Sequence, residues 1–415
     1  MMNDEWRAVG AKRFFIRHST FSVFLAALIL YALTAVLGGN FHHQKLAHFN
    51  LLADALLRGD LYLANPIYTH DLIRFQGRWF VPFPPGAALL LVPFVALFGV
   101  NFNEVALSVV VGAGNVALIY GLLRALTRQG FSRLDGQGVL WLMGLFAAGT
   151  AHWYAAASGG VSFLAHICAV TGLTAALLLA ATGRSPWLIG LAMAWALLSR
   201  PTLVLATPAV AVLWLEARRR LEPTGATQDV GSLLRAAALL APQAAALALL
   251  LAYNRLRFGN WLEFGYQWAQ TTFELGTRLV TWGQFNWHYL PENLRVALAG
   301  LPLLRNKVPF IWPDPNGLSL FLATPTFLWL YTALRRDRVA IAAWLSLGLV
   351  CVPLLLYFNT GWVQFGYRFS LDFLPLAFML LAMGLQRISP LVKASIGLAW
   401  CVHLWGVVWW FARVY

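Results

Sequence analysis

The stretch FPPGAALLLVPFVALFG, Phe83 to Gly99, is apolar almost throughout, but it is short for a membrane span and prolines interrupt its start and its middle. A transmembrane helix needs about 20 apolar residues, and a run of roughly 10 to 14 is more typical of an interfacial or buried helix. Whether this stretch crosses the bilayer decides the side of the membrane on which every later loop lies. It therefore also decides which side any active site faces.

The composition indicates a polytopic membrane protein. Hydrophobic residues make up 60% of the chain and charged residues 11%, with a mean hydropathy of +0.67, whereas a soluble domain is about 45–50% apolar and about 25% charged. The net charge of +14 does not indicate nucleic acid as a partner, because the arginines form short clusters between apolar runs and no groove-sized basic face. The three cysteines lie in apolar segments without metal-ligand spacing.

The apolar runs predict the membrane spans. Basic residues precede the first run, Thr20–Leu37, and no small-residue cleavage site follows it, which predicts an uncleaved span with a cytoplasmic N-terminus. Between Pro186 and Leu215, the sequence SRPT divides a longer run into two short spans. The other predicted spans are Glu104–Leu126, Gly138–Ala157, Phe163–Ala181, Ser232–Tyr253, Leu318–Leu334, Val339–Phe358, Phe373–Leu385 and Ala394–Ala412.

Charge parity then places the opening stretch. Basic clusters mark candidate cytoplasmic loops at Arg124/Arg128/Arg133, Arg184, Arg218–Arg220 with Arg235, Arg335/Arg336/Arg338 and Arg387/Lys393. All of them face inside only if an even number of spans separates each neighbouring pair. This holds if Phe83–Gly99 is a juxtamembrane or re-entrant helix on the outer side. The sequence thus predicts an all-α polytopic protein, a single transmembrane domain over residues 1–415 with about eleven spans, the N-terminus in and the C-terminus out.

Two large outer loops follow from this topology, at residues 38–103 and 254–317. In the first, Leu46–Leu57 has apolar residues at helical spacing and Gly59 stops the helix, while Gln76-Gly77 predicts a turn between two extended pieces. The second loop is rich in Trp, Tyr and Phe. Such residues form either the aromatic belt of a membrane interface or the lining of a sugar site.

Several segments resemble bacterial GT-C-type glycosyltransferases, the integral-membrane relatives of protein O-mannosyltransferases and aminoarabinose transferases. They are ADALLRGDLYL (53–63), FPPG (83–86), SRPT (199–202), YNRLRFGNWLEFGY (253–266) and FNTGWVQFGYRFSLDFLP (358–375), together with the cytoplasmic N-terminus and a first outer loop with juxtamembrane helices. The resemblance implies transfer of a sugar from a polyprenyl-phosphate donor to an acceptor at the outer face of a bacterial plasma membrane, with membrane lipids as further partners and without a certain cofactor. The sugar and the acceptor stay open.

The resemblance also implies a carboxylate that takes the acceptor proton. Members of the superfamily usually place an Asp just after the first span, but the corresponding window here, HHQKLAH at residues 42–48, holds no acid. The candidates for the base are Asp71, in a polar turn, then Asp54 and His43. The alternatives are a loop-ordering role for Asp71 and an i,i+4 salt bridge to Arg58 for Asp54. The adjacent histidines 42 and 43 point to different sides of any element, so we predict no metal site.

A lipid phosphate requires cationic partners, and an arginine near the membrane is costly unless it meets an anion. The candidates are Arg200 between two apolar half-spans, Arg368 and Arg257. Their alternatives are headgroup contacts and, for Arg368, an i,i+4 ion pair with Asp372. The candidates for contacts to sugar or acceptor are Glu263, Tyr266, Gln364, Tyr367 and Asp372.

Two other functions compete with glycosyl transfer. A flippase or secondary transporter for lipid-linked glycans would also be polytopic with buried arginines, but such folds commonly show matching repeats and the two halves of this chain do not match. A catalytically inactive homologue that binds glycolipids is the second alternative, because the early Asp is missing.

Overall fold

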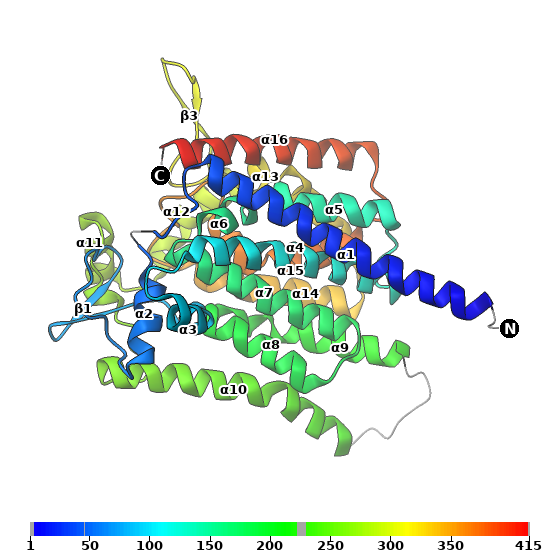
Figure 1. Cartoon of the computed structure of the whole chain (residues 1–415). Coiled ribbons are helices and arrows are strands. Elements are labelled where there is room, and N and C mark those ends of the chain that lie inside the picture. Colours follow the sequence, from blue (N-terminus) through cyan, green and yellow to red (C-terminus); the bar gives the residue numbers. More distant parts are fainter. Residues whose placement is uncertain (1–3, 45, 222–229, 414–415) are drawn as a thin grey trace.

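The computed structural model describes residues 4–44, 46–221 and 230–413; the side chains of the basic residues at 7–17 lie outside the described part. Long helices run roughly side by side between the two ends of a bundle (Figure 1). Within the described residues, six helices are long and apolar enough to cross a membrane. They are α1 (Asp4–Leu37), α4 (Glu104–Arg128), α7 (Val161–Ala181), α10 (Val230–Phe258), α14 (Arg338–Leu355) and α16 (Pro390–Arg413). The prediction of an all-α polytopic membrane protein is confirmed.

The other predicted spans are built from shorter pieces. They are α5 (Gly136–Ala148) with α6 (His152–Ser158), α8 (Pro186–Ser199), η1 (Pro201–Ala206) with α9 (Thr207–Leu221), α13 (Leu320–Ala323) with η5 (Pro325–Ala333), and η6 (Arg368–Asp372) with α15 (Leu374–Gly384). The predicted spans Gly138–Ala157 and Leu318–Leu334 are therefore each divided into two helical pieces. The α5 helix ends before Gly149, and Pro325 lacks the backbone N–H that would continue α13. Because a 3₁₀ turn rises about 2.0 Å per residue against 1.5 Å in an α-helix, η5 reaches further than an α-helix of its length.

The predicted cytoplasmic loops meet at one end of the bundle. Arg220 donates to the carbonyl oxygen of Gln129 over 2.6 Å, and Arg133 donates to the Gln386 side chain over 3.1 Å. Arg335 donates to the Met383 carbonyl oxygen over 2.9 Å. The basic clusters thus gather at one end, as charge parity requires. The count of eleven spans and the side that this end faces stay predictions.

The opening stretch forms α3 (Gly86–Phe98) at the opposite end of the bundle (Figure 1). Length alone does not decide that α3 stays on one side, because α8 and α15 are equally short. The position of α3 agrees with the prediction: α3 packs on α2 (His48–Leu57) and begins against the end of α8, where a Cβ on Gly86 would lie 2.7 Å from the Leu198 carbonyl oxygen. One face is buried through Leu91 and Val95, and Leu97 at the other face is 77% exposed.

The segment 38–103 otherwise has the predicted elements. Strands β1 (Ile73–Phe75) and β2 (Arg78–Phe80) form an antiparallel hairpin around Gln76-Gly77, with Ile73 opposite Phe80. The segment 254–317 adds η2 (Tyr266–Trp268), α11 (Phe273–Trp282), η3 (Trp287–Tyr289), α12 (Leu290–Leu294), the π-helix η4 (Arg295–Ala299) and strands β3 (Leu303–Leu304) and β4 (Ile311–Trp312). These elements lie at the same end as α3 or beside it (Figure 1).

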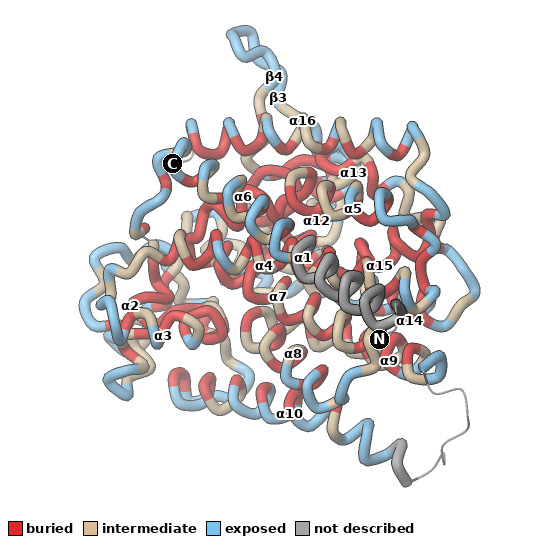
Figure 2. The backbone as a smooth tube through the Cα atoms, turned by 45° about the vertical axis from the view of Figure 1, so that its right-hand side comes forward, coloured by how far each residue is buried: buried red, intermediate tan, exposed pale blue. Residues whose placement is uncertain are grey.

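The core of the bundle surrounds α7. Of the most apolar window in α7, 78% is buried inside the protein, against 22% for α1. Figure 2 shows buried backbone in the middle of the bundle and exposed turns along the outward faces of α10 and α16. Apolar side chains exposed on those outward faces, such as Leu249 and Leu404, are expected where the solvent is lipid.

The placement of α3 predicts a labelling pattern. In a variant without native cysteines, Arg74→Cys before α3 and Asn101→Cys after α3 should both react with an impermeant maleimide from the outside. Arg336→Cys, in a basic cluster, should react only from the cytoplasm. Labelling of positions 74 and 101 from opposite sides would make α3 a membrane span and would overturn the topology.

Candidate functional site

A cleft of about 300 Å³ opens at the end of the bundle that carries α3 and β1–β2. Its walls come from the 69–83 segment, the ends of α7 and α8 nearest α3, the 266–275 segment and the loop between α14 and α15. The polar residues that line it are His70, Asp71, Ser162, His166, Arg200, Tyr266, Thr271, Thr272, Tyr357, Asn359 and Arg368. Segments far apart in the sequence thus converge on one polar cavity.

A buried salt bridge lies behind the cleft. Arg200 donates from Nη2 to Oδ2 of Asp372 over 2.8 Å, and its Nε lies 3.0 Å from the same oxygen. The Asp372 side chain is fully buried, and that of Arg200 is 17% exposed. Arg200 can reach it because the α-helix ends at Ser199 and Pro201 starts a 3₁₀ helix, so the backbone of Arg200 is extended, with φ −146°.

Two more groups complete the surroundings of the Asp372 carboxylate. The Nδ1 of His166 donates to Oδ1 over 2.8 Å, and the Thr202 hydroxyl lies 3.3 Å from Oδ2. Arg200, His166 and Thr202 thus surround the buried carboxylate with hydrogen-bond donors. Asp372 is therefore an ionised structural anchor whose oxygens are already engaged, and it is not among the residues that line the cleft.

The alternative given for Arg368, an i,i+4 ion pair with Asp372, is contradicted by the structure. The two residues lie in the 3₁₀ helix η6, where side chains three residues apart align, and the structure gives Asp372 to Arg200 and His166 instead. The hydrogen bond of His166 to Asp372 joins α7 to η6, and His166 also lines the cleft. The position of His166 on the cleft wall was not predicted, because a single polar residue in an apolar helix does not indicate whether it faces a cavity or another helix.

Arg368 is the cation of the cleft without an acid. Its residue is 9% exposed, its Nη1 lies 3.3 Å from the Ser162 hydroxyl, and its Nε has no hydrogen-bond partner in the described part of the chain. Its guanidinium carbon lies 5.2 Å from the centre of the Phe163 ring and 5.7 Å from that of Phe369. Arg200 occupies the Asp372 carboxylate, so the buried positive charge of Arg368 is left at the cleft without an ion-pair partner.

Tyr266 and Tyr357 form the wall between the cleft and a smaller, mostly apolar cavity of about 110 Å³. Their rings meet at 90° with centroids 6.1 Å apart. Burial raises the pKa of both phenols, so that both remain hydrogen-bond donors at neutral pH. Arg200 also lines both cavities, and it is the only residue with a full charge among the described residues that line the smaller one.

Asp71 lies at the rim of the cleft. Its backbone has φ +63°, and its N–H donates to the Gln270 carbonyl oxygen over 2.8 Å. The Asp71 side chain is 43% exposed. Among the described residues that line the cleft, it is the only one with a carboxylate. A left-handed backbone in a residue other than glycine is uncommon and recurs at functional sites.

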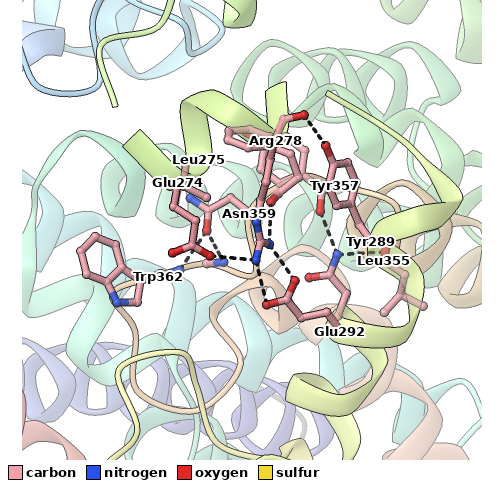
Figure 3. Close-up of polar contacts among 12 residues, drawn as sticks. Glu274, Leu275, Arg278, Tyr289, Glu292, Leu355, Tyr357, Asn359 and Trp362 are labelled. Carbon is pink, nitrogen blue, oxygen red and sulfur yellow. Dashed lines mark hydrogen bonds and ion pairs between the residues drawn. The ribbon is translucent and has the colours of Figure 1, made fainter. Parts of the chain in front are cut away.

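A second ion cluster holds two walls of the cleft together. Figure 3 shows the Arg278 guanidinium between the carboxylates of Glu274 and Glu292. The Arg278–Glu292 contact measures 2.7 Å and the Arg278–Glu274 contact 3.0 Å. Asn293 donates to the carbonyl oxygens of Leu355 and Tyr357. These bonds fix α11 and α12 to the segment that presents Tyr357 to the cleft.

The other candidate bases lie away from the cleft lining. Asp54 pairs with Arg58 on the outer face of α2, which confirms the alternative given for it. His43 lies 2.9 Å from the Glu104 carboxylate, and this hydrogen bond raises the pKa of His43. Neither side chain lines the cleft.

Several predicted binding residues have structural partners instead. Arg257 donates to the Val81 carbonyl oxygen over 2.7 Å and lies over the Tyr253 ring. The Glu263 carboxylate accepts from the N–H of Gly265 over 2.5 Å. The Gln364 side chain is fully buried and accepts from the N–H of Arg368 over 2.6 Å. Neither these three nor Tyr367, which is 3% exposed, line the cleft.

Thus Asp71, Arg200, Arg368 and Tyr266 are brought together at the cleft, and the remaining candidates are not. Tyr357, Asn359 and Ser162 were missed. Asn359 lies inside the quoted segment 358–375 and Tyr357 directly precedes it, so this segment was the signal that could have found them. Among the described residues, no group of three or more His, Cys, Asp or Glu is arranged to hold a metal ion.

Comparison with known proteins gives likenesses of structure only. No family model and no curated protein sequence matches the chain. A crystal structure of ArnT from Cupriavidus metallidurans bound to undecaprenyl phosphate matches with a TM-score of 0.47 and 13% identity, over 93% of this chain and 62% of that one. The Archaeoglobus fulgidus oligosaccharyltransferase tethered to an acceptor peptide matches with a TM-score of 0.47 and 12% identity, over 97% of this chain and 55% of that one.

A further match is the archaeal oligosaccharyltransferase AglB from Archaeoglobus fulgidus in complex with an inhibitory peptide and a dolichol-phosphate, with a TM-score of 0.45, 12% identity, and coverage of 89% and 50%. These are membrane glycosyltransferases of the GT-C type, the class that the sequence resembles. The chain spans less than two thirds of each of them. At such identities and TM-scores, the likeness assigns neither reaction nor substrate to this chain.

The buried pair predicts a stability cycle. Asp372→Ala leaves the guanidinium group of Arg200 without its anion and should lower the free energy of unfolding by about 3–5 kcal/mol, measured by denaturation in detergent micelles. The double variant Arg200→Met with Asp372→Leu should lose less free energy of unfolding than the sum of the losses in the single variants Arg200→Met and Asp372→Leu. The control Asp54→Ala removes an exposed pair and should cost at most about 1 kcal/mol. Equal losses for Asp372→Ala and Asp54→Ala would contradict the anchoring role.

Proposed function

We propose that this protein transfers a sugar from a polyprenyl-phosphate-linked donor to an acceptor at the outer face of a bacterial plasma membrane. The observation that carries this proposal is the uncompensated positive charge of Arg368 in the cleft. A buried cation without an anion is strongly destabilising, whereas the same cation facing a phosphate gains charge-assisted hydrogen bonds. The cleft is therefore suited to an anionic ligand.

The smaller cavity supports a lipid-linked donor. It adjoins the cleft at Arg200, Tyr266 and Tyr357, and its other walls include Phe285, Pro353 and Leu354. A phosphate at Arg200 and Arg368 would have the apolar cavity on one side and the polar cleft on the other. This arrangement fits an apolar carrier joined through phosphate to a polar sugar.

The acceptor reaction needs a base, and Asp71 is in the position to supply one. In a single displacement, the acceptor oxygen forms a bond to the anomeric carbon while the bond from that carbon to the phosphate oxygen breaks, with inversion. The Asp71 carboxylate takes the acceptor proton, and the leaving phosphate keeps the electron pair of the broken bond and is stabilised by the arginines. Asp372 is unsuited as the base, because Arg200, His166 and Thr202 occupy its oxygens.

The first test separates the two loop acids. Asp71→Asn keeps the size of the side chain but removes the base, so transfer should fall by about 10²–10⁴-fold. It is measured with radiolabelled undecaprenyl-phosphate hexoses and pentoses and membrane extracts as acceptor. The matched variant Asp54→Asn, in the same loop, should keep wild-type activity. Transfer by Asp71→Asn at the wild-type rate would remove Asp71 as the base.

Wild-type protein that binds undecaprenyl phosphate but transfers none of these sugars would favour the inactive glycolipid-binding homologue. Movement of the labelled lipid across proteoliposomes without transfer would favour the flippase.

The second test concerns the phosphate. Arg368→Gln should weaken binding of undecaprenyl phosphate by about 10–100-fold, the equivalent of roughly 1.5–3 kcal/mol for hydrogen bonds to a charged group. Arg368→Lys should recover part of the loss, because it keeps the charge without the planar fork. Arg255→Gln, an exposed arginine at the end of α10, serves as the control and should bind like the wild type. Equal affinity in the Arg368→Gln and Arg255→Gln variants would place the phosphate elsewhere.

A further inference from the structure

The hairpin formed by residues 301–312 is the part of the described structure that projects farthest from the bundle (Figures 1 and 2). Strands β3 and β4 pair Leu303 with Trp312 and Leu304 with Ile311, and the N–H of Arg305 donates to the Phe310 carbonyl oxygen over 2.8 Å. At its base, the N–H of Ser319 donates to the Gly300 carbonyl oxygen over 3.0 Å. The hairpin is thus held at its base and free of the bundle at its tip.

The surface of this hairpin is unusual for a segment in water. Leu304 is 85% exposed, Val308 81% and Phe310 61%. Arg305 and Lys307 are exposed as well, and the segment 301–312 contains no Asp or Glu. The Arg305 guanidinium lies 4.2 Å from the centre of the Trp312 ring. Exposed apolar residues with basic and aromatic neighbours are the composition of segments that lie in a membrane interface.

The direction of the hairpin places it at membrane-surface level. In both views it points past α16, across the direction of the long helices, and in Figure 1 it leaves the bundle beside the C-terminal end of α16. The ends of the long helices mark the headgroup layers, whichever side they face. A segment that runs sideways at this level extends along the membrane surface, not into the aqueous phase.

We propose that the 301–312 hairpin is a membrane-surface anchor, with Leu304, Val308 and Phe310 inserted between lipid headgroups and with Arg305 and Lys307 on lipid phosphates. Lipid is the occupant that the charge favours, because two cations without an acid complement phosphate, and lipid already surrounds a bundle that exposes apolar side chains. A two-stranded hairpin is marginally stable alone, and insertion supplies the apolar surroundings that its tip lacks.

The test measures the depth of the tip in lipid. The full-length chain, with its three native cysteines replaced by alanine, receives a spin label at Val308→Cys and is placed as a single copy in phosphatidylcholine nanodiscs. The ratio of oxygen to nickel-complex accessibility should be severalfold higher than at Ala64→Cys, an exposed loop position, and lower than at Leu33→Cys on the exposed face of α1.

The charge of the hairpin gives a second measurement. Phosphatidylglycerol in the discs should raise the ratio at position 308 further, and Arg305→Gln with Lys307→Gln should abolish that rise, while Arg255→Gln should preserve it. A ratio at position 308 equal to that at position 64 in both lipids would overturn the proposal. So would insertion-like shielding that appears only when two labelled copies share a disc, since the occupant would then be a second copy. None of these readouts depends on sugar transfer.

Discussion

The salt bridge between Arg200 and Asp372 is the interaction on which the candidate site depends. It joins the break between α8 and η1 to the 3₁₀ helix η6, two segments 172 residues apart in the sequence. Asp372 is fully buried, and Arg200, His166 and Thr202 stabilise its charge. The pair therefore fixes the ends of α7, α8 and α15 relative to one another. With those ends fixed, Arg200 lines both cavities. Arg368 lies on η6 together with Asp372, and it lines the cleft without an acidic partner.

The cleft combines a base made of packed helix ends with a rim made of loops. The base of the cleft is built from spans, whereas Asp71 and Tyr266 come from the two large loops. The loops are fixed to each other by backbone pairing of Ile73 with Ala269, and to the bundle by the Arg278 cluster (Figure 3). A site of this kind can hold a phosphate firmly, because the cations sit on packed helices, while the loops at the rim can differ between acceptors.

The sequence predicted the general architecture because hydropathy and charge parity are global signals. They identified the long spans, the gathering of the basic loops and the helix at Gly86–Phe98. The helix breaks at Gly149 and Pro325 were missed, because hydropathy does not report which backbone hydrogen bonds form. At the site, Arg200 was predictable because a charge between apolar half-spans is costly without a purpose. The pairing of Asp372 with Arg200 was not predicted. The alternative for Arg368 assumed α-helical spacing where the chain forms a 3₁₀ helix, and contacts between residues distant in the sequence produce no periodic pattern.

The missing early acid is accounted for by what occupies its window. His43 and the backbone of Gln44 both bind the Glu104 carboxylate, which ties the window to the start of α4. A few residues on, the Nε2 of buried His48 donates to the carbonyl oxygen of His70 over 2.8 Å. The His70 carbonyl group immediately precedes Asp71. The window 42–48, which contains no acidic residue, therefore holds the turn that contains Asp71. The carboxylate at the cleft thus comes from later in the same loop, and His48 holds the turn before it through the backbone.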